Sequence, residues 1–200
     1  MPLLKRRVLS AETRIDDLIS AAASLFVAKG IDATTVDDIV MRAFVGKGTF
    51  YHYFDSKTDV ILALRERFAE NFIQRVAAAV DACPANDHPA RFGAWLTAAV
   101  ETYLASYKLH DVVFHDFTHS RRQSQEKDGV ISQLVSLLED GEQAGAWQFA
   151  NARTVALVLF DGMHGVVDDA IAAGRRDTEV LVKQLLVVLS RLLQIENLQR

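Results

Sequence analysis

The sequence predicts an all-α protein with an N-terminal three-helix domain that contains a helix-turn-helix, followed by a C-terminal helical domain. Apolar residues recur at spacings of three and four along most of the 200 residues, which is the period of an α-helix. No run alternates apolar and polar residues between turn signals, so no sheet is expected. We place the domains at residues 1–56 and 57–200, with a connecting helix over residues 57–82.

The first helix is expected over residues 11–29. Ser10 can cap its start, an apolar stripe that includes Leu18 and Phe26 runs along it, and Gly30 supplies the stop. A second, short helix should begin after Thr35, because Asp38 stands three residues later as the acidic half of a capping box.

A third helix is expected from about Lys47, with Gly46 as its cap. Phe50 and Phe54 would point inward, which leaves other side chains of this helix facing outward. The outward set offers a cation, a hydroxyl, a phenol and an imidazole, a combination suited to the major groove of DNA: Lys47, Thr49, Tyr51 and His52.

The block from Val45 to Lys57, VGKGTFYHYFDSK, resembles the signature of the tetracycline-repressor (TetR) family of bacterial transcription regulators. The close match runs from about Arg14 to Leu64, and beyond it the resemblance is one of architecture. It implies a dimer that binds a double-stranded DNA operator. Outward direction and the resemblance together give these expected DNA contacts: Thr35, Lys47, Gly48, Thr49, Tyr51, His52 and Lys57, with Arg6 and Arg7 from the N-terminal arm.

Two residues depart from the family pattern in the turn before the third helix. Phe44 stands where the family usually has Gly, and Gly46 stands where it usually has Ser. A left-handed Phe44 would cost roughly 1 kcal/mol that Gly would not, and the Gly46 cap would cost about a few tenths of a kcal/mol. We therefore expect a looser turn.

Charge is distributed unevenly along a chain whose net charge is −4. Residues 1–14 carry four basic side chains against the single acidic Glu12, a balance of +3. Such an arm would confine nucleic-acid contact to one end; the alternative is a solubilising tail.

Because Cys83 is the single cysteine, no disulfide can form within one chain. With no signal-peptide pattern and no apolar run of ~18 residues, we expect a cytoplasmic protein without a membrane partner.

The C-terminal domain should contain further helices, the last from about Thr178 to Ile195. That helix is apolar over a wide arc, so it needs a second surface to bury. The TetR resemblance implies a four-helix dimer interface from the last two helices of each subunit; the alternative is a monomer with a large core. The expected interface residues are Met163, Val167, Leu181, Leu185, Val188 and Leu192.

Aromatic and histidine side chains gather in this domain. Such a set can line a small-molecule pocket or simply fill a core, and the expectation of a pocket rests mainly on the TetR resemblance. The expected lining residues are Trp95, Tyr103, Tyr107, Phe114, Phe117 and His164.

A metal site is not expected. His115 and His119 would share a helix face, and His110 is close in sequence, but no complete set of ligands appears. No phosphate-cradling loop or nucleophile elbow is present either, so we expect neither a cofactor nor an enzyme.

These observations predict a ligand-responsive DNA-binding regulator, a repressor that is released by a small apolar or amphipathic effector. Two alternatives stay open: a regulator controlled by a partner protein or a metal, and a helical enzyme with an incidental helix-turn-helix. The operator, the effector, the regulated genes and the sign of regulation are left undetermined by the sequence.

Overall fold

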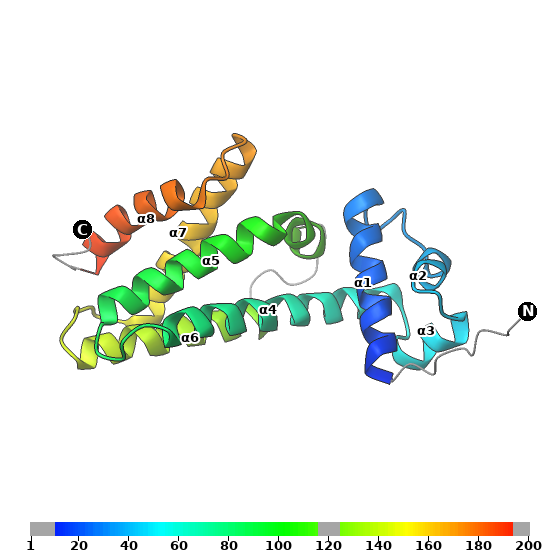
Figure 1. The fold of residues 1–200 in the computed structure, drawn as a ribbon, viewed down its shortest axis with the longest axis horizontal. Coiled ribbons are helices and arrows are strands. Elements are labelled where there is room, and N and C mark those ends of the chain that lie inside the picture. The colour runs from blue at the N-terminus through cyan, green and yellow to red at the C-terminus, as the bar shows by residue number, and fades with distance from the viewer. Residues whose placement is uncertain (1–10, 116–124, 194–200) are drawn as a thin grey trace, which may run out of the picture. The chain divides into compact units, whose positions relative to one another are not determined.

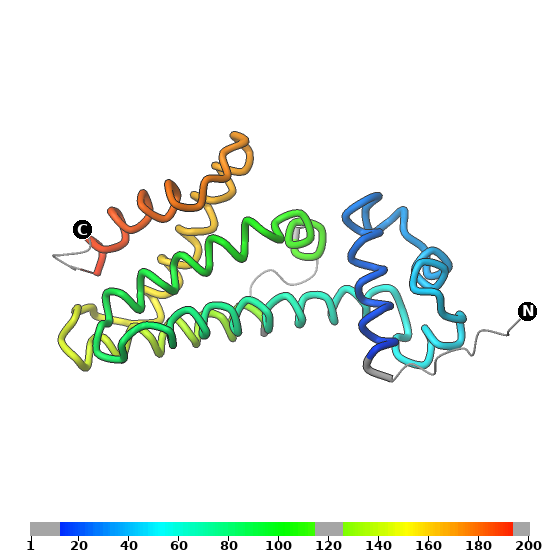
Figure 2. Tube along the Cα trace, viewed as in Figure 1, coloured from blue at the N-terminus to red at the C-terminus, as the bar shows by residue number. Residues whose placement is uncertain are grey.

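A computed structural model describes residues 11–115 and 125–193. The described residues form eight α-helices and one π-helix and contain no strand, which confirms the all-α prediction (Figures 1 and 2). The elements are α1 (Ala11–Lys29), α2 (Val36–Arg42), α3 (Lys47–Tyr53), α4 (Lys57–Asp81), α5 (His88–His110), a π-helix (Asp111–His115), α6 (Gln125–Gln143), α7 (Ala152–Ala172) and α8 (Thr178–Leu192).

The chain divides into two compact units. The first comprises the residues up to Arg67 together with the segment that begins at Lys108, and the second comprises Phe68–Tyr107 together with α6, α7 and α8. By packing, the first unit therefore takes in the start of α4 and the end of α5. A functional division at residues 56 and 57 stays a prediction.

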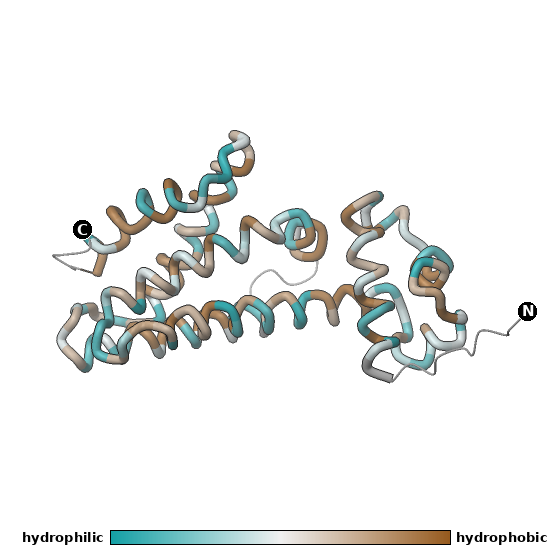
Figure 3. Tube along the Cα trace, in the orientation of Figure 1, coloured by the Kyte–Doolittle hydropathy of each residue, from teal (hydrophilic) through white to brown (hydrophobic). Residues whose placement is uncertain are grey.

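The first unit is built on α1, α2, α3 and the start of α4. Each helix carries apolar residues on one face, so that brown and teal alternate along the tube in Figure 3. Those faces meet in one core, to which the π-helix adds Val113. Its fully buried members include Leu18, Phe26, Ile39 and Phe50.

The second unit is organised around α7, which packs against both α6 and α8. Its core includes Trp95 and Tyr103 of α5 and Leu134 of α6. Trp147 also lies in this core, where its indole Nε1–H donates to the Leu138 carbonyl at 2.7 Å. Gly141 makes this packing possible, because a Cβ atom at that position would collide with the indole ring.

Candidate nucleic-acid interface

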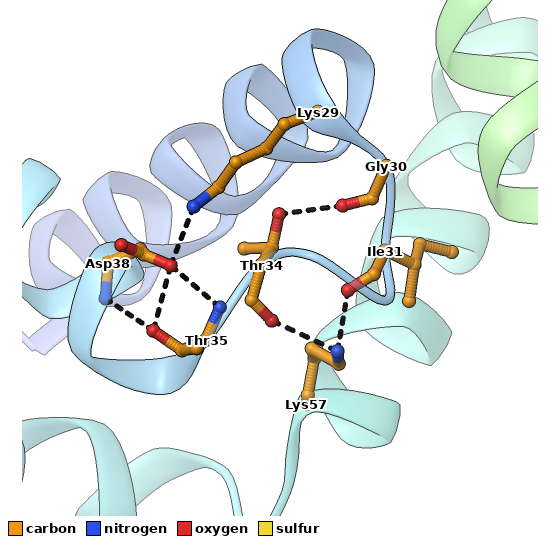
Figure 4. Close-up of polar contacts among 7 residues, drawn as sticks. All are labelled: Lys29, Gly30, Ile31, Thr34, Thr35, Asp38 and Lys57. Atoms are coloured by element: carbon orange, nitrogen blue, oxygen red, sulfur yellow. Dashed lines mark hydrogen bonds and ion pairs between the residues drawn. The ribbon is translucent and has the colours of Figure 1, made fainter.

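Short hydrogen bonds fix the start of α2. The Thr35 backbone N–H and hydroxyl each donate to Oδ2 of Asp38 at 2.8 Å, and the Asp38 N–H donates to the Thr35 hydroxyl at 3.2 Å (Figure 4). The predicted capping box is therefore confirmed. Lys29 of α1 adds an ion pair, with its Nζ 2.7 Å from the same carboxylate oxygen. The bond from Lys29, followed by those from Thr35, holds the pKa of Asp38 well below its usual range.

The loop before α2 is held from the other side by Lys57. The Lys57 ammonium donates to the carbonyls of Ile31 at 2.5 Å and Thr34 at 3.0 Å (Figure 4). Buried Thr34 in turn donates its hydroxyl to the Gly30 carbonyl at 2.7 Å. The side chain expected on a DNA phosphate thus connects the first turn of α4 to the loop between α1 and α2.

Helix α3 turns its apolar side inward as predicted. Phe50 is fully buried, Phe54 is nearly so, and their rings pack 5.7 Å apart. Tyr51 lies edge-on against Phe50 but remains 51% exposed. Thr49 is half-buried, and the other predicted outward residues are exposed. We call the set Lys47, Gly48, Thr49, Tyr51 and His52 the reading face.

Electrostatics of the reading face centre on Lys47. Its ammonium lies 2.8 Å from Oδ1 of Asp37 in α2, and this hydrogen-bonded ion pair raises the pKa of Lys47. Both partners are largely exposed, so the pair costs little to separate. Lys47 can therefore exchange Asp37 for a phosphate or a base edge. Arg6 and Arg7 lie outside the described residues.

A second polar cluster lies in the second unit, around Tyr103. Its hydroxyl donates to Oδ1 of Asp168 at 2.6 Å, and its ring lies 4.6 Å from that of His164. Nδ1 of His164 is 3.0 Å from the Phe160 carbonyl, and burial lowers the pKa of the imidazole. Lys127 contributes a cation 5.5 Å from the Phe160 ring centroid.

Comparison with known proteins identifies the first unit. A family profile described as "Bacterial regulatory proteins, tetR family" matches residues 18–64. The transcriptional repressor BepR of Brucella suis is 26% identical over 202 residues, covering 88% of this chain and 93% of BepR. The repressor KstR2 of Mycolicibacterium smegmatis is 26% identical over 145 residues, 68% of each chain. Residues 18–64 therefore form a DNA-binding domain of the TetR family. The chain is a DNA-binding transcription regulator.

Solved structures share the fold over nearly the whole length. FadR from Bacillus halodurans, a fatty acid degradation regulator, superposes with a TM-score of 0.77 at 21% identity, covering 94% of this chain and 97% of FadR. A Rhodococcus sp. RHA1 protein of unknown function reaches 0.78 at 20% identity, covering 96% and 99%. At these identities the likeness concerns the fold alone.

The six residues expected to line a pocket are distributed over both units and the undescribed segment. Trp95, Tyr103, Tyr107 and His164 belong to the second unit, where Tyr107 stacks under the Arg176 guanidinium, 4.7 Å away. Phe114 belongs to the first unit. Phe117 lies outside the described residues.

Four of the six expected dimer residues are buried within the protomer. Met163 and Val167 are fully buried, and Leu181 and Leu185 are 4% and 3% exposed, so all four serve the core and not an outer surface. Val188 and Leu192 are exposed at 64% and 45%. Because α8 is apolar over a wide arc, the spacing of its residues did not show which of them face the core and which are exposed. The exposed apolar residues of α7 and α8 are Val158, Val166, Val180, Val187, Val188 and Leu192.

The histidines considered for a metal have other surroundings. The His110 ring packs 4.8 Å from that of Phe114. The side chain of His115 and all of His119 lie outside the described residues. Where the structure describes the chain, no group of three or more His, Cys, Asp or Glu residues could hold a metal, and no helix is long and apolar enough to cross a membrane.

Lys57→Met should destabilise the protein by about 1.5–3 kcal/mol, because it leaves two carbonyls without their charged donor. Lys47→Met is the matched control: its exposed pair with Asp37 contributes little to stability, but its loss should weaken DNA binding. Urea unfolding and binding to operator DNA, measured on both variants, check this division. Equal unfolding midpoints for Lys57→Met and the wild type would contradict the positioning role of Lys57.

Burial of His164 predicts a loss of stability as the pH falls. Its pKa is lowered on folding, so the unfolded chain takes up the proton first, and stability decreases as the pH falls below about 6.5. His164→Phe should flatten this decrease between pH 7 and 5 in urea unfolding. Phe149→Leu replaces one side chain that does not titrate with another elsewhere in the second unit, so it should lower the free energy of unfolding equally at each pH. An unchanged slope in His164→Phe would refute the assignment.

Proposed function

We propose that this chain is a homodimeric repressor, which binds a pseudo-palindromic operator and is released by a small apolar or amphipathic effector. The observation that carries the proposal is the reading face: it is presented on α3 while the two phenylalanines beneath it lie in the core. Its side chains contact base edges in the major groove. Thr35 and the arm residues Arg6 and Arg7 contact the DNA backbone, and Lys57 acts by holding the loop before α2.

Dimerisation is proposed through the exposed apolar residues of α7 and α8. These six side chains lie exposed on two helices that pack against each other, so both helices present apolar groups that a second copy would cover. An exposed apolar surface of this kind favours association. A dimer also places two reading faces on the two half-sites of one operator, which a single α3 of seven residues cannot span.

An unsatisfied donor in the second unit supports an amphipathic effector. Trp95 is 1% exposed, and its indole Nε1–H has no acceptor among the described residues. A buried donor without a partner costs about 1–3 kcal/mol. An effector whose carbonyl or carboxylate oxygen accepts this hydrogen bond would recover that cost, while its apolar part packs among Tyr103, Tyr107 and His164.

Helix α5 supplies the route from effector to DNA. It belongs to the second unit up to Tyr107 and to the first unit from Lys108 onward. In the first unit, buried Arg65 donates its Nε–H to the Val113 carbonyl at 2.7 Å and stacks on Phe114, 5.1 Å from the ring centroid. A shift of α5 on effector binding is therefore transmitted to α4 through Arg65 and on to the reading face.

Tyr51→Ala tests the function directly. Genomic fragments retained by the wild-type protein supply the operator, and loss of the phenol should weaken its binding roughly 5–150-fold, the equivalent of about 1–3 kcal/mol. Tyr107→Ala removes a tyrosine from the second unit and should leave operator affinity unchanged without effector. Titrating amphipathic carboxylates and amides against the complex should then release the DNA from the wild type.

If Tyr51→Ala bound operator as tightly as the wild type, the reading face would be assigned wrongly. Failure of every such compound to release the DNA would favour control by a partner protein. Turnover of a compound without operator binding would favour the enzyme alternative.

Val188→Glu tests the dimer surface. A charge at this exposed apolar position should dissociate the dimer into folded 22.2 kDa protomers and abolish operator binding. Val27→Glu, at an exposed valine of α1, should leave the mass at the dimer value. Leu185→Glu should unfold the protomer, because that position lies in the core. Light scattering with circular dichroism separates these outcomes, and a folded, dimeric Val188→Glu would place the interface elsewhere.

A further inference from the structure

The turn between α2 and α3 exposes an aromatic ring on a left-handed backbone. Phe44 has φ 55° and is 92% exposed. Among the described residues, the other positions of positive φ are all glycines: Gly30, Gly145 and Gly174. A bulky side chain in this conformation costs roughly 1–2 kcal/mol. No burial of the ring within the protomer offsets that cost.

The rest of the turn is well held, so the strain cannot relax by opening it. The Val45 N–H donates to the Val40 carbonyl at 3.1 Å, and the Phe44 N–H donates to the Met41 carbonyl at 3.3 Å. Val40 is buried in the core of the first unit. Backbone strain that persists in a well-packed turn points to a use for the side chain outside the protomer.

The neighbours of Phe44 favour DNA as the molecule that covers it. Two exposed cations flank Phe44 in the sequence, Arg42 before it and Lys47 after it. The exposed carboxylate of Asp37 is already paired with Lys47. Phe44 also adjoins the reading face, three residues before Lys47. Cations on both sides would hold phosphates close to the ring, and duplex DNA offers apolar carbon surface in its deoxyribose rings and thymine methyl groups.

We propose that the Phe44 ring packs against the carbon surface of operator DNA beside the reading face, and that this contact offsets the strain of its left-handed backbone. The inference rests on the proposed function, because it places the turn on the DNA. It adds a contact residue at the position where the chain departs from the TetR pattern.

The test compares Phe44→Gly and Phe44→Ala. Phe44→Gly should raise the unfolding midpoint, because glycine adopts positive φ freely, and yet it should weaken operator binding. Phe44→Ala keeps a non-glycine backbone and removes only the ring, so a loss of roughly five- to tenfold in affinity would be due to the ring itself. Leu62→Ala, at an exposed leucine of α4, is the matched control and should bind operator as the wild type does.

Operators with uracil in place of thymine identify the surface that the ring touches. If Phe44 packs on a thymine methyl, the substitution should weaken the wild type and leave Phe44→Ala unaffected. If it packs on deoxyribose, both proteins should respond equally to uracil while Phe44→Ala remains the weaker binder. In either case the salt dependence of binding should keep its slope, because the ring carries no charge.

Unchanged operator affinity in Phe44→Ala, alongside weakened binding by Tyr51→Ala, would overturn the ring contact and leave the proposed function intact. Loss of affinity in Phe44→Gly alone would assign the effect to turn rigidity and would also overturn it. If the wild type bound no operator, the proposed function would fail, and this inference with it.

Discussion

The structure of the DNA-binding unit depends on how the loop between α1 and α2 is tied. Two cations do this from opposite sides: Lys29 binds the Asp38 carboxylate, and Lys57 binds two backbone carbonyls of the loop. The Lys57 ammonium thus reaches the carbonyls of Ile31 and Thr34, which lie 26 and 23 positions before it in the sequence. Charge-assisted bonds of this kind are stronger than neutral ones, so they fix where α2 begins and, through the short turn, where α3 points.

Features of the DNA-binding unit that depend on residues close in sequence could be predicted. Those that depend on contacts between residues far apart in sequence could not. Thr35 and Asp38 lie three residues apart, so their capping box could be inferred from spacing alone, as could the inward direction of Phe50. The target of Lys57 could not, because its acceptors are backbone carbonyls, which leave no signature in a sequence. The phosphate contact expected for Lys57 followed from its place at a helix start and stays a prediction, while the structure shows that the same ammonium holds the loop before α2.

The second unit shows a different limit. Helix α8 is apolar over a wide arc, so periodicity alone did not show which of its residues face the core. The structure buries Leu181 and Leu185 and exposes Val188, which divides the predicted interface residues of α8 between core and surface. The predicted pocket stays a prediction, and its residues fall in both units: Phe114 follows α5 in sequence but packs in the first unit, where the Arg65 guanidinium lies over its ring.

Helix α3 cannot exist without the core beneath it, and this links stability to regulation. A helix of seven residues with a glycine cap is marginal in isolation, so the reading face keeps its shape only while Phe50 and Phe54 stay buried. Val113 belongs to the same core, although it comes from the π-helix that continues α5. An effector that displaced α5 would therefore loosen that core as well as move α4. In that case release of DNA needs no large rotation, because partial loss of order in α3 removes the preorganised contacts on which operator affinity depends.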